Sequence, residues 1–130
     1  MVIPYGINGE GYEVIRYTRG MKAQDTDIII PDKYKGKKVI AIGEKAFAGC
    51  TKLANVELNE GLKTIGAAAF GGCTGLTSIA IPVSVTSISA EAFNKSTNLT
   101  TINYAGTAEQ WAALKVTLGE GVTVNYNYQG

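Results

Sequence analysis

The sequence predicts a strand-dominated α/β solenoid, built from stacked coils of about 23 residues with a cap at each end. An internal repeat is the first reason. The string AIGEKAFAGCTKL at 41–53 returns as TIGAAAFGGCTGL at 64–76 and as SISAEAFNKSTNL at 87–99, offset by 23 residues each time. Composition is the second reason, because 45% hydrophobic residues, 18% charged residues and 16 glycines suit a compact, strand-rich fold rather than a disordered chain.

Three full repeats, 39–61, 62–84 and 85–107, align without gaps. Coils stacked about 4.8 Å apart would turn each shared apolar column into a continuous ladder, which buries surface that one coil alone could not. The shared columns are Ile42, Ile65 and Ile88; Ala46, Ala69 and Ala92; Phe47, Phe70 and Phe93; Leu53, Leu76 and Leu99; Val56, Ile79 and Ile102; and Leu58, Ile81 and Tyr104.

Each repeat contains two short β-prone runs joined by a turn. LANVEL, LTSIAI and LTTINY end with the alternation typical of a strand, and KVIAI, LKTI and VTSI form the second run. The Ala-rich segment GEKAFAGC and its copies predict one tight helical turn, α or 3₁₀. Gly49 and Gly72 mark sharp turns, and the column of Cys50, Cys73 and Ser96 is expected to donate hydrogen bonds to a neighbouring coil.

The two ends depart from the repeat and predict caps. We expect a single domain over 1–130, with an N-terminal cap and partial repeat at 1–38, full repeats at 39–107 and a C-terminal cap at 108–130. GYEVIRY at 11–17 predicts a strand. TDIIIP at 26–31 matches TSIAIP at 77–82, so Ile28 and Ile30 correspond to Ile79 and Ile81, and five extra residues follow in the loop PDKYKGKK.

The C-terminal cap is predicted to contain a helix and a closing strand. Thr107 and Gln110 have the spacing of a capping box. Trp111 and Leu114 fall on one face of the helix that this box would start. VTVNYNY at 122–128 predicts the closing strand, which would shield the edge of the ladder.

Several classes of function are disfavoured by composition. The absence of His removes Ser–His and Cys–His nucleophile pairs and His-ligated metal sites, and two Cys cannot form a four-thiolate zinc site. We therefore expect no enzyme and no cofactor. A net charge of +1 gives no strong attraction to nucleic acid or anionic membrane. No apolar run approaches the roughly 18 residues of a membrane span, and the first residues lack the features of a signal peptide.

The unit LTSIAIP, SVTSI, AEAF, NKST and NL resembles the BspA-type leucine-rich repeats of bacterial surface proteins, and the likeness covers residues 12–115. Ile-Pro after the strand, Ser-Ile before the turn, Ala-Phe, Gly-Cys and Leu recur at fixed offsets. The third repeat departs from the pattern at Ser89 and at Asn94–Ser96. The resemblance implies a right-handed leucine-rich repeat solenoid on an exported protein, located extracellularly or on the cell surface. Members of this family are mostly adhesins or host-protein binders, and no catalytic motif carries over.

In this class of repeat, the side chains between the strand hydrophobics point outward on one face, where solenoids usually bind partners. We predict that this face binds a ligand. Its two columns are Asp27, Asn55, Ser78 and Thr101, and Ile29, Glu57, Ala80 and Asn103. The alternative, which the residue types favour, is that these are ordinary solvated strand residues, because neither column contains an aromatic residue or Arg.

Four other features allow a second interpretation. Lys33, Lys35, Lys37 and Lys38 with Tyr34 could contact sulfated glycans or acidic proteins, although a solvated loop is favoured. Asp25, Asp27 and Asp32 lack the spacing of an EF-hand calcium loop. Trp111 could form a carbohydrate platform, but a capping role is favoured. Cys50 and Cys73 would lie within disulfide range on adjacent rungs, but two buried thiols are favoured.

The leading functional prediction is a noncatalytic cell-surface binding module, an adhesin-like protein–protein interaction domain that acts as a monomer. Its partner would be a protein, such as a host surface or matrix protein, with no role for nucleic acid or membrane insertion. The alternative is a structural spacer or capping domain that presents another domain of a larger surface protein.

Overall fold

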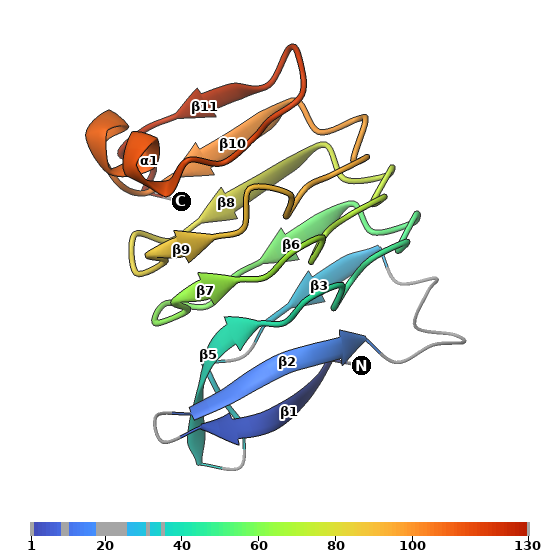
Figure 1. The fold of residues 1–130 in the computed structure, drawn as a ribbon, viewed down its shortest axis with the longest axis vertical. Coiled ribbons are helices and arrows are strands. Elements are labelled where there is room, and N and C mark those ends of the chain that lie inside the picture. The colour runs from blue at the N-terminus through green and yellow to red at the C-terminus, as the bar shows by residue number, and fades with distance from the viewer. Residues whose placement is uncertain (1, 9–10, 18–25, 31, 35, 130) are drawn as a thin grey trace.

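The computed structural model describes residues 2–8, 11–17, 26–30, 32–34 and 36–129, with only the backbone described for 2–8, 11–17, 34 and 37. Each repeat contributes one strand to each of two sheets, which produces a parallel solenoid of about four coils (Figure 1). The first sheet contains β3 (Asp27–Ile29), β6 (Asn55–Glu57), β8 (Ser78–Ile81), β10 (Thr101–Tyr104) and β11 (Thr123–Asn125). The second contains β1 (Val2–Asn8), β2 (Gly11–Tyr17), β5 (Lys37–Ile42), β7 (Thr64–Ile65) and β9 (Ser87–Ile88), and β4 (Lys33–Tyr34) pairs with β5.

The strand register confirms the repeat alignment. Ile79 pairs with Ile102 across β8 and β10, and Ile65 pairs with Ile88 across β7 and β9. Between β3 and β6 the offset widens to 28 positions, which is the 23-residue repeat plus the five extra residues. Part of this extra segment forms a hairpin, in which β4 pairs antiparallel with the start of β5 and Gly36 takes a φ of +80°. The described part of the predicted loop is therefore a hairpin, and the register of the solenoid continues beyond it.

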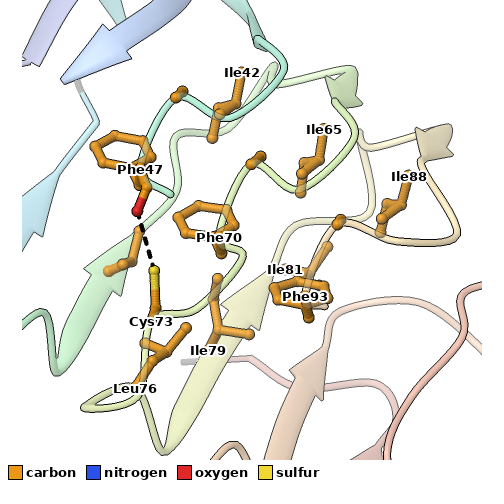
Figure 2. Packing of buried hydrophobic residues seen from close by; sticks show 14 of the residues in the cluster. Ile42, Phe47, Ile65, Phe70, Cys73, Leu76, Ile79, Ile81, Ile88 and Phe93 are labelled. Atoms are coloured by element: carbon orange, nitrogen blue, oxygen red, sulfur yellow. Dashed lines mark hydrogen bonds between the residues drawn. The ribbon is translucent and has the colours of Figure 1, made fainter. Parts of the chain in front are cut away.

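The core is a set of side-chain ladders, and the Phe ladder lies in its centre (Figure 2). The rings of Phe47 and Phe70 stack with centroids 5.3 Å apart, and those of Phe70 and Phe93 stack at 5.7 Å. Every residue of the six predicted columns is buried except Leu58, which is half-buried. Burial of like residues on adjacent rungs therefore holds the coils together, as the repeat predicts.

The prediction of a helical turn in each repeat is wrong. Residues 44–49 form consecutive hydrogen-bonded turns instead. The N–H groups alternate: Phe47 donates to Ala69 of the next coil at 2.8 Å, whereas Ala46 donates back to Gly43 at 3.2 Å. Lys45 and Ala68 adopt left-handed φ angles of 59° and 53°, which a right-handed helical turn does not permit. Hydrogen bonding between coils therefore outweighs the helix propensity of the Ala-rich segment.

A second left-handed position recurs just before the Cys column. Gly49 and Gly72 have φ angles of 76° and 69°, which confirms the predicted sharp turns. Lys95 occupies the same place in the third repeat with a φ of 63°. A residue with a Cβ is strained in this region, so at this position the third repeat bears a backbone cost that glycine spares the other two.

We expect Lys95→Gly to raise the free energy of unfolding by roughly 0.5–1 kcal/mol, because the relief of left-handed strain outweighs the added flexibility of the unfolded chain. Urea titration of the two proteins measures the change. Lys95→Ala is the matched control, because it removes the same charge and keeps the Cβ. An equal gain in the alanine variant would show that charge rather than backbone strain is responsible.

Side chains of the Cys and Ser column form hydrogen bonds with the backbone of the preceding coil, as predicted. The Cys73 Sγ lies 3.2 Å from the Phe47 carbonyl oxygen (Figure 2). The Ser96 hydroxyl donates to the Phe70 carbonyl oxygen at 2.5 Å. Cys50 and Cys73 are both buried, and no disulfide joins them. Burial, with a further contribution from neighbouring Cys50, raises the pKa of the Cys73 thiol to about 12.

We expect Cys73 to resist alkylation in the folded protein. The thiolate is the reactive form, and a pKa of about 12 leaves Cys73 almost fully protonated at neutral pH. Mass spectrometry after iodoacetamide treatment should find Cys73 unmodified in buffer, and both cysteines modified in denaturant without reductant. If denatured protein took up the label only after reduction, the cysteines would be bridged and the assignment as thiols would be wrong.

The two ends of the solenoid are closed by different elements. At the N-terminus, β1 pairs antiparallel with β2, and β2 adds in parallel to the edge of β5. The sequence predicted β2 but not β1, in which Pro4 lacks a backbone N–H and falls at a shift in the register with β2. Because β1 is an edge strand, this missing donor disrupts no central ladder.

The C-terminal cap has the predicted helix and strand. Helix α1 (Ala108–Leu114) has Thr107 as its N-cap residue. The Thr107 side chain accepts a hydrogen bond from the Gln110 N–H, and the Gln110 side chain accepts one from the Thr107 N–H. Trp111 is buried against Tyr104, with ring centroids 5.1 Å apart. Strand β11 then pairs in parallel with β10. The cap therefore covers both the last core rung and the open edge of the first sheet.

Candidate functional site

The predicted binding columns belong to the sheet formed by β3, β6, β8, β10 and β11 (Figure 1). Their greater exposure places them on the side of this sheet that faces away from the core. The inward residues Ile28, Val56, Ile79 and Ile102 alternate with them and are buried in the core. The register brings the predicted residues together in rows: Asp27 with Asn55, Ser78 with Thr101, Ile29 with Glu57, Glu57 with Ala80, and Ala80 with Asn103. We call this surface the strand face.

Exposure changes along the strand face. Asp27, Ile29, Asn55 and Glu57 are exposed, and Ile29 presents 68% of its surface to solvent. The four residues on β8 and β10 are half-buried: Ser78, Ala80, Thr101 and Asn103. The residues of the strand face are therefore more exposed on β3 and β6 than on β8 and β10.

Two hydrogen-bonded pairs fix polar side chains on the strand face. The Asn55 Nδ2 donates to the Asp27 Oδ1 at 2.7 Å, and the Asn125 Nδ2 donates to the Asn103 Oδ1 at 2.9 Å. Each pair joins adjacent strands, so the side chains are held in place without a ligand. This arrangement lowers the entropy lost when a partner orders the surface.

Strand β11 extends both columns beyond the 23-residue repeat. Thr123 pairs with Thr101, and Asn125 pairs with Asn103, so both residues belong to the strand face. Sequence reasoning predicted the strand but did not include these two residues. Their alternation with Val122 and Val124, which pack against the core, was the available signal.

A groove of about 290 Å³ adjoins the strand face where β6 and β8 end. The sequence did not predict it. The C-terminal segment forms one wall: the Asn127 N–H donates to the Gly106 carbonyl and the Tyr128 N–H donates to the Tyr104 carbonyl. Tyr128, 37% exposed, thereby provides the aromatic side chain that the two columns themselves lack.

The remaining candidates fall outside this surface or lack support. Lys33 and Lys38 are exposed on the β4–β5 hairpin, whereas Lys35 and Asp25 lie outside the described residues. Asp27 and Asp32 are exposed, and the described part of the chain contains no group of three or more metal-ligating side chains. Trp111 is 8% exposed within the cap, so the carbohydrate platform is not formed.

Comparison with known families decides what kind of repeat this is. The profile described as "BspA type Leucine rich repeat region (6 copies)" matches residues 22–112, well over half of the chain. This chain belongs to the BspA-type leucine-rich repeat family. A search of curated proteins found no match. Within the described residues, no helix has the length and apolar character needed to cross a membrane.

Solved structures of leucine-rich repeat proteins share the fold. A leucine-rich repeat protein of T. pallidum is 26% identical with a TM-score of 0.69, over 94% of this chain and 60% of its own. One from Bacteroides ovatus is 26% identical with a TM-score of 0.64, over 94% of this chain and 34% of its own. A leucine-rich cell surface protein of Faecalibacterium prausnitzii is 28% identical with a TM-score of 0.51. The match covers 84% of this chain and 39% of that protein. The chain thus spans 60% or less of the length of each of these three proteins.

Proposed function

We propose that this BspA-type chain is a noncatalytic binding module of a cell-surface protein and that its strand face holds a protein partner in an adhesin-like manner. The observation that carries the proposal is the alignment of two outward columns over five parallel strands, with polar side chains already fixed by the pairs Asn55–Asp27 and Asn125–Asn103. A preorganised surface of this kind favours binding of a folded partner. The module acts as a monomer, and its partner is a protein such as a host surface or matrix protein.

Two further observations support this proposal. The opposite sheet presents only the short strands β7 and β9 in the second and third repeats, with two residues each. The first sheet continues past the last repeat, because β11 pairs with β10. One structural neighbour is a cell surface protein, which supports a surface location for this chain.

A binding screen tests the proposal against the alternative of a structural spacer. The purified chain would be immobilised and exposed to a panel of extracellular matrix proteins and host cell-surface ectodomains, and binding would be measured by biolayer interferometry. We expect saturable binding to at least one panel member, with a dissociation constant in the micromolar range or below. If the chain bound no member of the panel at micromolar concentrations, the result would favour the role of a structural spacer.

A further inference from the structure

The groove beside the strand face has a chemistry of its own. Its described lining includes two carboxylates, from Glu57 and Glu60, and no Lys or Arg. Neither carboxylate makes an ion pair or a side-chain hydrogen bond within the described part of the chain. Since the net charge of the whole chain is +1, this acidic rim is a local feature and not a consequence of overall composition.

The rest of the groove is largely apolar. Leu58, Ala80 and Pro82 contribute to its walls, and Tyr128 stands on the side formed by the C-terminal segment. A volume of about 290 Å³ falls just below the roughly 300–1,000 Å³ of sites that enclose drug-sized ligands. The size therefore suits one long side chain of a protein partner rather than a separate small molecule.

We propose that this groove receives an arginine side chain of the protein partner, an inference that rests on the proposed function of the strand face. The aliphatic part of arginine can lie against the apolar wall while its guanidinium remains near the carboxylates. A guanidinium also stacks on aromatic rings and is more weakly hydrated than an ammonium group, which favours arginine over lysine beside Tyr128. Glu57 belongs to both the groove and the strand face, so one partner can occupy the two together.

A peptide titration tests the groove without any protein partner. The ¹⁵N-labelled chain would be titrated with the peptide acetyl-Gly-Arg-Gly-amide and, separately, with the same peptide containing citrulline, which keeps the shape of arginine and lacks its charge. We expect saturable amide shifts at Leu58, Glu60 and Ala105 with the arginine peptide, and weaker binding as NaCl is raised. Equal shifts with the citrulline peptide, or none at these residues, would overturn the assignment.

Matched variants locate the effect. Glu57→Gln with Glu60→Gln should weaken binding of the arginine peptide at least about fivefold, whereas Glu91→Gln with Glu109→Gln removes the same charge from exposed positions outside the groove and should leave binding unchanged. Tyr128→Leu should weaken it, whereas Tyr126→Leu, also at an exposed tyrosine, should not. Equal losses in the groove variants and their controls would contradict the proposal. Failure of this peptide test would remove the arginine site alone, because the panel screen measures partner binding independently.

Discussion

Replacing Phe70 with alanine should lower the free energy of unfolding by about 3–5 kcal/mol. Phe70 is fully buried, and its ring stacks on Phe47 on one side and on Phe93 on the other, with nearly parallel planes on both sides. Removing it empties the central rung, and the stacked backbones above and below cannot close the gap because their hydrogen bonds fix the spacing between coils. Chemical denaturation monitored by circular dichroism measures the loss.

Phe93→Ala is the matched comparison. Phe93 belongs to the same column but is 6% exposed, and it borders a smaller hollow between the third coil and the C-terminal cap. Because its surroundings are less tightly filled, we expect a smaller loss of stability than in Phe70→Ala. Equal losses in the two variants would contradict the view that stability depends on a ladder with a central rung.

Deleting residues 108–130 should lower the free energy of unfolding by as much as Phe70→Ala does, or by more. The deletion removes Trp111 from its contact with Tyr104 and exposes the edge of β10, which otherwise pairs with β11. It also removes five half-buried apolar side chains that pack on the core: Leu114, Val116, Leu118, Val122 and Val124. Uncapped solenoid ends present apolar rungs and unpaired strand edges, which promote association. We therefore expect a less stable chain that dimerises or aggregates, as measured by light scattering at matched concentration.

Trp111→Ala separates packing from edge protection. This variant leaves β11 in the sequence and removes one large buried side chain, so we expect a loss of about 3–5 kcal/mol without the same tendency to associate. A truncated chain that remained monomeric and as stable as the full chain would show that the C-terminal segment is an accessory rather than a cap.

The repeat made the fold predictable because the 23-residue period constrains every coil in the same way. Once Ile65 and Ile88 occupy equivalent positions, the strands on which they lie must pair, and the structure places them side by side. The columns of the strand face followed from the same alternation. What the period could not predict is structure that occurs once, such as β1, the β4–β5 hairpin and the position of Tyr128.

The error in the turn has a different origin. Ala-rich segments favour helix when only local interactions are considered. In the stack, the N–H groups of Lys45, Phe47 and Gly49 have carbonyl acceptors on the next coil, at 2.8–2.9 Å, and these bonds decide the backbone conformation. The groove could not be predicted from the sequence for a related reason. The position of Tyr128 in its wall depends on the left-handed backbone conformation of Asn127. Such a conformation has no periodic signature in the sequence.

The most direct test of the central claim is to measure which sheet carries the binding surface. Two double variants change adjacent rungs in the same way: Ser78→Arg with Thr101→Arg on the strand face, and Thr64→Arg with Ser87→Arg on the opposite sheet. Both should fold, and affinity for the partner identified by the panel screen would be measured for each. We predict that the strand-face variant loses at least about tenfold in affinity, a change of about 1.4 kcal/mol, while the opposite-sheet variant binds like the parent chain. Equal affinities for the two variants, or a loss confined to the opposite sheet, would contradict the account.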